Sequence, residues 1–197
     1  MDAKKYRRFY WEVGALEDNT ADSEESMLWR GSPGDLSALR RGIGREPGEV
    51  AAMWRFYTRL NENGFVNRVL RAEHITLGLF GIHQQGEEMC VHNGKTRLGT
   101  AMAQLRRDGY SSEAIDRRFV AAATANDIYE VAVHLGSLVR LLKTLVPTQR
   151  LNYTQLFKDL ANWQDPNNID RVRRQWGADY YLQQILQIEK DERKKNE

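Results

Sequence analysis

The sequence predicts an all-α protein, and two observations carry that prediction. Apolar residues recur at spacings of three and four along most of the chain, which is the period of a helix that buries one face. The alternation typical of a half-buried strand is almost absent. Its only candidate, residues 75–79, lies inside a longer segment of helical pattern. We therefore expect a helical bundle in two packed halves, residues 1–97 and 98–197.

Besides the segment of helical pattern around residues 75–79, the first half contains two expected helices and two stretches without an apolar pattern. A capping residue and a proline at Ser32–Pro33 predict a helix that begins there, and a second helix is expected after Pro47. The apolar residues of that second helix are Val50, Met53, Trp54, Tyr57 and Leu60. Residues 17–25 form an acidic linker, and residues 84–96 form a polar loop.

The second half is more regular. The clearest stripe predicts a core helix over residues 127–146, which Pro147 ends. The Asp165–Pro166 pair predicts the start of the last helix, whose final residues, 189–197, form a mixed-charge end that we expect to fray. Three further helices are indicated by apolar spacing. The first contains Leu98, Met102 and Leu105 and ends at Gly109, and the second contains Ile115 and Phe119 and begins after Ser111 or Ser112. The third contains Leu156, Phe157, Leu160 and Trp163.

Composition excludes several classes of protein. Charged residues make up 28% of the chain and hydrophobic ones 41%, which are ordinary values for a soluble globular protein. No segment approaches the twenty or so apolar residues of a membrane span, and no signal-peptide pattern opens the chain. The single cysteine, Cys90, cannot form an internal disulfide. These features predict a reduced cytoplasmic protein without a membrane partner.

Sites for catalysis or cofactors are weakly supported. Asn93–Gly94–Lys95–Thr96 has the ending of a phosphate loop, but Met89 stands where that loop needs a glycine. His74, His83, His92 and Cys90 offer only an isolated Cys-x-His pair, whereas a metal site needs three or four converging ligands. No paired carboxylates lie on an apolar face for acid–base work. We expect no enzymatic activity, no cofactor, no metal and no small-molecule substrate.

Arginines carry the strongest functional signal. The formal charge is only +2, from 29 basic and 27 acidic residues, so the positions of the charges matter more than their total. In the last helix, Ile169, Val172, Trp176 and Tyr180 form a stripe for burial, while Arg171, Arg174 and Tyr181 fall on the opposite side. Guanidinium groups keep their charge and bind phosphate through paired donors. The same helix carries Arg173, and further pairs are Arg40–Arg41, Arg106–Arg107, Arg117–Arg118 and Arg140 with Lys143.

The alternative is that these charges only solvate a bundle surface or pair with acids, as Arg118 could with Asp159 or another buried acid. The order of the motifs favours the functional interpretation. The motifs occur in this order along the chain: Ala38–Gly42, Leu98–Leu105, Arg117–Arg118–Phe119, Leu138–Lys143, Tyr153–Leu160 with Trp163, and Arg173–Tyr181. That succession, over about residues 35–181, resembles the small subunit of the type I-E CRISPR Cascade complex, the CasB family.

The resemblance implies an all-helical, non-catalytic protein that assembles as two copies beside the backbone and large subunits of an RNA-guided complex. It implies contacts with guide RNA and target DNA, including the displaced strand. By motif, the phosphate contacts would be Arg40, Arg41, Arg117, Arg118, Arg140, Lys143, Arg173 and Arg174, and Arg171 joins them on helical geometry. The remaining alternative is a helical protein–protein adaptor that makes no contact with nucleic acid.

Overall fold

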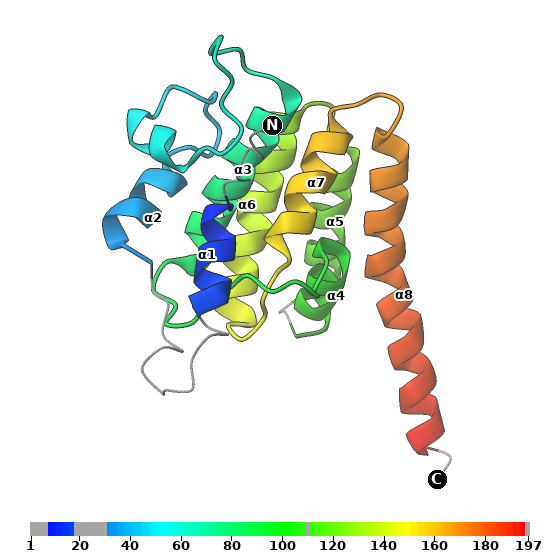
Figure 1. Ribbon diagram of the computed structural model, residues 1–197. Helices are drawn as coiled ribbons and strands as arrows, with labels where there is room; N and C mark the ends of the chain where they lie inside the picture. The colour runs from blue at the N-terminus through cyan, green and yellow to red at the C-terminus, as the bar shows by residue number, and fades with distance from the viewer. Residues whose placement is uncertain (1–7, 18–30, 109–110, 196–197) are drawn as a thin grey trace, which may run out of the picture.

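The computed structural model describes residues 8–17, 31–108 and 111–195 of the chain. The all-α prediction is confirmed: these ranges contain helices and one isolated parallel bridge between His92 and Leu151, and no strand. The α-helices are α1 (Tyr10–Glu17), α2 (Pro33–Arg40), α3 (Arg68–Gln84), α4 (Leu98–Asp108), α5 (Ser112–Thr124), α6 (Ile128–Leu145), α7 (Tyr153–Trp163) and α8 (Ile169–Lys195). Figure 1 shows α3, α6 and α7 side by side in the centre, with α8 along one side and projecting past the others.

Side-chain caps explain where several helices begin. The first backbone N–H groups of a helix have no partner inside it, and an oxygen of the preceding residue satisfies them. Asp127 accepts from the backbone nitrogens of Tyr129 and Glu130 at 2.7 and 2.9 Å, and this fixes the start of α6 as predicted. Equivalent caps at α3, α5 and α7 come from Asn67, Ser111 and Asn152.

One hydrophobic core runs through the described part of the chain. The predicted apolar stripes of α4, α5, α6 and α7 are buried, and α3 packs against α2, α6 and α7. The single candidate strand lies within α3, where residues 75–80 are all buried. The division into halves at residues 97 and 98 stays a prediction.

The start of the last helix differs from expectation. The start predicted at Pro166 is wrong, because α8 begins at Ile169. Asp165 instead closes a turn: its carbonyl accepts from the backbone nitrogen of Asn168 at 2.9 Å, and its carboxylate accepts from that of Asn167 at 3.0 Å. At the other end the helix continues to Lys195.

The helix predicted after Pro47 is wrong in type and length. The segment forms a short 3₁₀ helix, η2 (Ala51–Phe56), and Trp54 and Leu60 are each 54% exposed. The α-helical interpretation treated both as core residues. α2 does begin at Pro33 with Ser32 at the N-cap, as predicted, although the Ser32 side chain makes no capping hydrogen bond.

A buried carboxylate accounts for the end of that 3₁₀ helix. Glu73 on α3 is fully buried and accepts hydrogen bonds from the backbone nitrogens of Thr58 at 2.8 Å and Arg59 at 3.0 Å. In a continuing α-helix those nitrogens would donate to carbonyls of the preceding turn. Burial raises the pKa of Glu73, while the hydrogen bonds from Thr58 and Arg59 act in the opposite direction.

Two predicted loose stretches have different outcomes. Except for Glu17, the last residue of α1, the acidic linker at residues 17–25 lies outside the described residues. Except for Gln84, the last residue of α3, the polar loop at residues 84–96 is irregular in backbone, yet Cys90, Val91 and His92 within it are buried. The backbone nitrogen of Leu151 donates to the carbonyl of Val91 at 2.9 Å, so this loop is tied to the start of α7.

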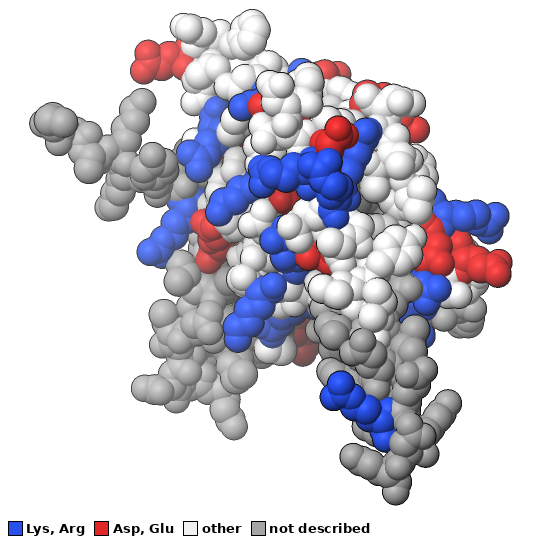
Figure 2. Space-filling view, turned by 90° about the vertical axis from the view of Figure 1, so that its right-hand side faces the viewer, with Lys and Arg blue, Asp and Glu red and all other residues white. Residues whose placement is uncertain are grey.

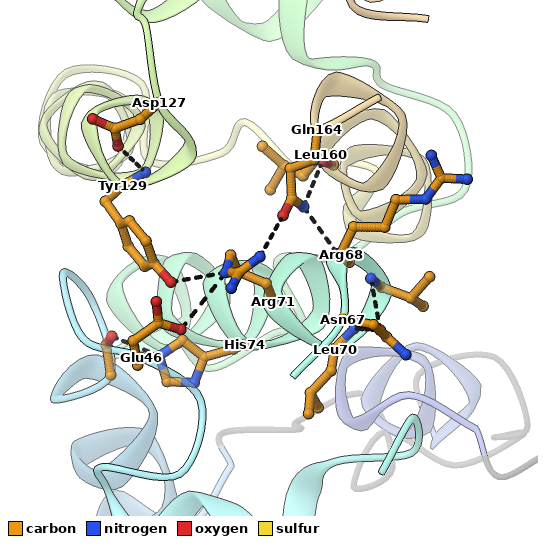
Figure 3. Close-up of polar contacts among 12 residues, drawn as sticks. Glu46, Asn67, Arg68, Leu70, Arg71, His74, Asp127, Tyr129, Leu160 and Gln164 are labelled. Atoms are coloured by element: carbon orange, nitrogen blue, oxygen red, sulfur yellow. Dashed lines mark hydrogen bonds and ion pairs between the residues drawn. The ribbon is translucent and has the colours of Figure 1, made fainter. Parts of the chain in front are cut away.

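Arg71 joins elements that are distant in the sequence (Figure 3). From α3, its Nε donates to the hydroxyl of Tyr129 on α6 at 2.8 Å and lies 3.6 Å from a carboxylate oxygen of Glu46. Its Nη1 donates to the side-chain oxygen of Gln164, just after α7, at 3.3 Å. Arg71 therefore helps to fix α6 and α7 against α3.

Candidate nucleic-acid interface

α8 is fixed by the face that the sequence predicted. Val172, Trp176 and Tyr180 are 3% exposed or less. The Trp176 indole nitrogen donates to Asp159 on α7 at 2.9 Å, and the Tyr180 hydroxyl donates to Asp116 on α5 at 2.5 Å. The buried stripe is confirmed, and it determines which side of α8 faces outward.

Close packing against α4 sets the position of this helix. A Cβ placed on Gly99 of α4 would lie 2.5 Å from the carbonyl oxygen of Trp176 and 2.9 Å from the backbone nitrogen of Tyr180. The backbones of α4 and α8 therefore approach more closely than a residue with a side chain would permit. Arg97 strengthens the same contact, because its Nε lies 2.8 Å from a carboxylate oxygen of Asp179.

Arg171 and Arg174 lie on the outer face of α8. Both are exposed, and among the described residues neither makes a hydrogen bond or an ion pair. Tyr181 is 46% exposed, and its ring meets that of Tyr180 edge to face at 5.0 Å. The outer face of α8 thus presents two guanidinium groups beside an aromatic ring.

Arg173 has a different environment from its neighbours. Its guanidinium donates to the carbonyl oxygens of Ala123 at 2.8 Å and Ala125 at 2.9 Å, at the end of α5, and lies 5.6 Å from the centre of the Trp163 ring. The last carbonyls of a helix have no donor within it, so a cation there satisfies otherwise unpaired acceptors. Sequence spacing alone could not separate this structural contact from the exposed arginines.

Arg117 and Arg118 are both exposed on α5 and line a shallow hollow between α5 and α6. The suggested pairing of Arg118 with Asp159 is wrong. Asp159 is held by Trp176 and by the side-chain nitrogen of Gln155 at 2.8 Å, while Arg118 donates to the carbonyl of Ala114 one turn earlier. Burial raises the pKa of Asp159, and the hydrogen bonds from Trp176 and Gln155 oppose that rise.

Arg40 and Lys143 meet at the end of α3, a convergence that the sequence did not indicate. The Arg40 guanidinium donates to the side-chain oxygen of Gln85, and the Lys143 ammonium donates to the Gln85 carbonyl. Burial lowers the pKa of Lys143, the carboxylate of Glu87 raises it, and Arg40 lowers it further. Arg41 and Arg140 are exposed and make no side-chain hydrogen bond or ion pair with described residues.

Other arginines are paired with acids and contribute to folding. Arg106 of α4 donates to Asp116 of α5 at 2.8 Å, and Arg68 donates to Asp165 at 2.5 Å. Burial alone raises the pKa of Asp116, but hydrogen bonds from Arg106 and Tyr180 hold it below its usual value.

Figure 2 shows the face along which α8 lies, where basic side chains gather in a band with acidic ones interspersed.

Histidines and the cysteine mostly belong to the core. The ring nitrogens of His74 lie 2.6 Å from the Tyr57 hydroxyl and 2.8 Å from the Gly42 carbonyl, and His83 Nδ1 lies 2.9 Å from the Tyr153 hydroxyl. Burial lowers the pKa of His74, His83 and His92. Within residues 8–17, 31–108 and 111–195, no group of three or more His, Cys, Asp or Glu side chains is arranged to hold a metal ion. No helix in these ranges is long and apolar enough to cross a membrane.

These features define an all-helical protein that presents arginines from several helices. A family model described as CRISPR-associated protein Cse2 matches residues 35–181, and the chain belongs to that family. The resemblance to the CasB family is thereby confirmed. Among curated proteins, none matches the chain.

Solved structures share the fold. CasB from Thermobifida fusca is 25% identical, with 88% of this chain and 99% of that chain covered and a TM-score of 0.60. CasB from M. ruber is 21% identical, with coverage of 93% and 98% and a TM-score of 0.64. A chain of a CRISPR RNA-guided surveillance complex is also 21% identical, with coverage of 91% and 92% and a TM-score of 0.64.

Proposed function

We propose that this protein is a non-catalytic structural subunit of an RNA-guided CRISPR surveillance complex, and that its basic surface binds nucleic acid. The bound regions are the guide RNA–target DNA duplex and the displaced DNA strand. Family membership supports the assembly, since a chain with the same fold occurs in such a complex. Its partners would be the backbone and large subunits and a second copy of itself.

The exposed pair on α8 is the observation that carries the nucleic-acid part of the proposal. Arg171 and Arg174 are three residues apart, so they lie on one side of the helix, and buried Trp176 holds the opposite side. Neither guanidinium is neutralised by an acid among the described residues. Unpaired guanidinium groups on a fixed helix are suited to the phosphates of a backbone, because they can donate two parallel hydrogen bonds.

Exposed arginines on other helices add to the basic groups available for such contacts. Arg117 and Arg118 lie on α5, which packs against both α6 and α8, and Arg140 lies on α6. Contacts of this kind recognise charge and shape, while the sequence of the target is read by pairing with the guide. Binding should therefore depend strongly on salt and little on base sequence.

Contacts with other subunits need exposed apolar side chains as well as charge. Trp54, Leu60 and Phe65 are 54%, 54% and 71% exposed, and they lie close together in the sequence. Exposed aromatic groups are enriched at protein interfaces. This segment supports the expected association with partner subunits, and it also favours the alternative of an adaptor without nucleic-acid contact.

A fluorescence-anisotropy titration tests the proposal. Full-length Arg171→Ala/Arg174→Ala is compared with the wild type on two unrelated single-stranded DNA sequences between about 50 and 200 mM salt. The double variant should bind both sequences more weakly to a similar degree. The slope of log Kobs against log salt should become shallower by about 1.4, since each lost phosphate contact contributes about 0.7.

Arg45→Ala is the matched control, because Arg45 is also exposed but lies 3.9 Å from Glu49 on its own turn. It should bind DNA as the wild type does. Unchanged binding by the folded double variant would remove α8 from the interface. If no oligonucleotide binds, either to the free protein or to the complex assembled with guide RNA, the adaptor function is correct.

A further inference from the structure

The hollow between α5 and α6 has a built arrangement of donors. Ala114, Arg117, Arg118 and Ala121 line it from α5, and their spacing of three, one and three places all four on one side of that helix. His134 lines it from α6. Its volume is about 320 Å³. The two alanines leave space between the longer side chains, so two guanidinium groups and one imidazole surround a small open site.

Both arginines are available to a ligand. Arg117 makes no hydrogen bond or ion pair with the described residues. Arg118 donates from Nη1 to the Ala114 carbonyl at 3.1 Å, which orients its guanidinium beside the hollow while its other N–H groups remain available. A guanidinium held in this way loses less conformational entropy when it binds an anion.

His134 differs from the other three histidines. His74, His83 and His92 are 0–7% exposed, and each makes a ring hydrogen bond within the core. The His134 side chain is 33% exposed, and its Nε2 lies 3.7 Å from Glu130, which is too long for a hydrogen bond. Its ring is therefore not needed to satisfy the fold.

The nearby acid is already engaged at the start of α6. Glu130 Oε2 accepts a hydrogen bond from the backbone nitrogen of Asn126 at 2.9 Å, while Asp127 caps the same turn. This arrangement resembles the reciprocal cap of a helix N-terminus, except that Glu130 accepts from the residue before the N-cap and not from Asp127 itself. Glu130 thus has a structural role of its own through Oε2, while its Oε1 lies 3.7 Å from His134. The lining of the hollow itself contains two guanidinium groups and one imidazole, and no carboxylate.

We propose that this hollow is a phosphate-binding subsite in which His134 acts together with Arg117 and Arg118 on one phosphodiester of a nucleic-acid backbone. The inference rests on the proposed function and adds to it a contact from His134, which the sequence did not indicate. The imidazole N–H and the two guanidinium groups donate to the non-bridging phosphate oxygens.

Imidazole NMR signals of the full-length protein provide the first test. The chain has only four histidines, and the three buried ones serve as internal references. A single-stranded DNA oligonucleotide should shift or broaden the His134 signals and leave the other three unchanged. Inorganic phosphate at millimolar concentration should have little effect, because the arginines elsewhere on the surface add affinity only for a continuous backbone.

Affinity measurements provide the second test. His134→Ala should weaken DNA binding about three- to tenfold, whereas His134→Gln, which keeps a donor, should weaken it less than about twofold. Ala121→Leu should fill the hollow without removing a charge, and it should weaken binding by a similar factor to His134→Ala. Val120→Leu is the control, because Val120 is exposed on α5 but does not line the hollow.

The outcomes separate this subsite from the wider proposal. If DNA leaves the His134 signals unchanged while Arg171→Ala/Arg174→Ala still weakens binding, the subsite is wrong and the proposed function stands. If phosphate shifts these signals and DNA does not, the hollow binds a free anion, which also overturns the inference. If no oligonucleotide binds and none shifts any imidazole signal, both proposals fail.

Discussion

Replacing Gly99 by alanine should destabilise the protein, because α4 and α8 are in backbone contact at this position. The new Cβ would lie 2.5 Å from the Trp176 carbonyl oxygen and 2.6 Å from the Asp179 Cβ. Favourable carbon contacts lie near 3.5–4.0 Å, so the helices would have to separate by about 1 Å. Overpacking of this kind typically costs about 1–3 kcal/mol.

The expected loss is smaller than that cost, since alanine favours a helix interior over glycine by about 0.5–1 kcal/mol, and Gly99, the second residue of α4, gains at most that amount. A net loss of about 1–2 kcal/mol should lower the melting temperature by roughly 2–8 °C for a chain of this size. Thermal unfolding followed by far-UV circular dichroism measures the change.

Gly177→Ala is the matched control. Gly177 lies within α8, and a Cβ added there meets nothing within 4 Å. The substitution should therefore stabilise the protein by about 0.5–1 kcal/mol, so that the two glycine variants move in opposite directions. A Gly99→Ala protein that melts at or above the wild-type temperature would refute the close approach of α4 and α8.

Two further predictions concern Arg173 and His83. Arg173→Ala should lower the free energy of unfolding by about 1–2 kcal/mol, because it leaves the carbonyls of Ala123 and Ala125 without a donor, whereas Arg174→Ala should change it by less than about 0.5 kcal/mol. Equal stabilities in urea titrations of the two variants would contradict the structural role of Arg173. Burial lowers the pKa of His83 from 6.5 to about 4. Between these two pH values the unfolded chain therefore binds more protons than the folded protein, so the stability present above pH 6.5 should be lost as the pH falls toward 4. The loss from this group amounts to roughly 3 kcal/mol, and His83→Gln, which can keep the hydrogen bond to Tyr153, should show a shallower decline across that pH window. Parallel pH profiles for wild type and variant would show that His83 is not the group responsible.

The success of the sequence predictions follows from local physics. Regular apolar spacing identified α5, α6 and α7, with Ser111 or Ser112 before α5 and Pro147 after α6, because these signals lie within or beside the segment that they describe. The segment after Pro47 failed for the opposite reason. Glu73 on a distant helix accepts from Thr58 and Arg59 and ends the helical turn there, and no pattern within residues 47–60 records that contact.

The arginines show the same limit. Arg171, Arg173 and Arg174 lie within four residues of one another, and periodicity correctly placed Arg171 and Arg174 on the outer face. It could not show that the end of α5 lies within reach of Arg173. Nor could it show that Arg40 and Lys143 meet at Gln85, or that His134 lies beside Arg117 and Arg118, because those neighbours come from separate helices.

The sequence by itself determined the all-α class, the buried stripe of α8 and the family to which the motifs point. Each of these depends on the types of residue at fixed spacings along one segment. Only the tertiary structure decided which basic groups remain free of acids and carbonyls among the described residues. A guanidinium group is available to a ligand only if no neighbouring helix places an acceptor within about 3 Å of it. Arg173 and Arg174 are adjacent in the sequence, yet Arg173 donates to two carbonyls at the end of α5, while Arg174 makes no hydrogen bond with the described residues.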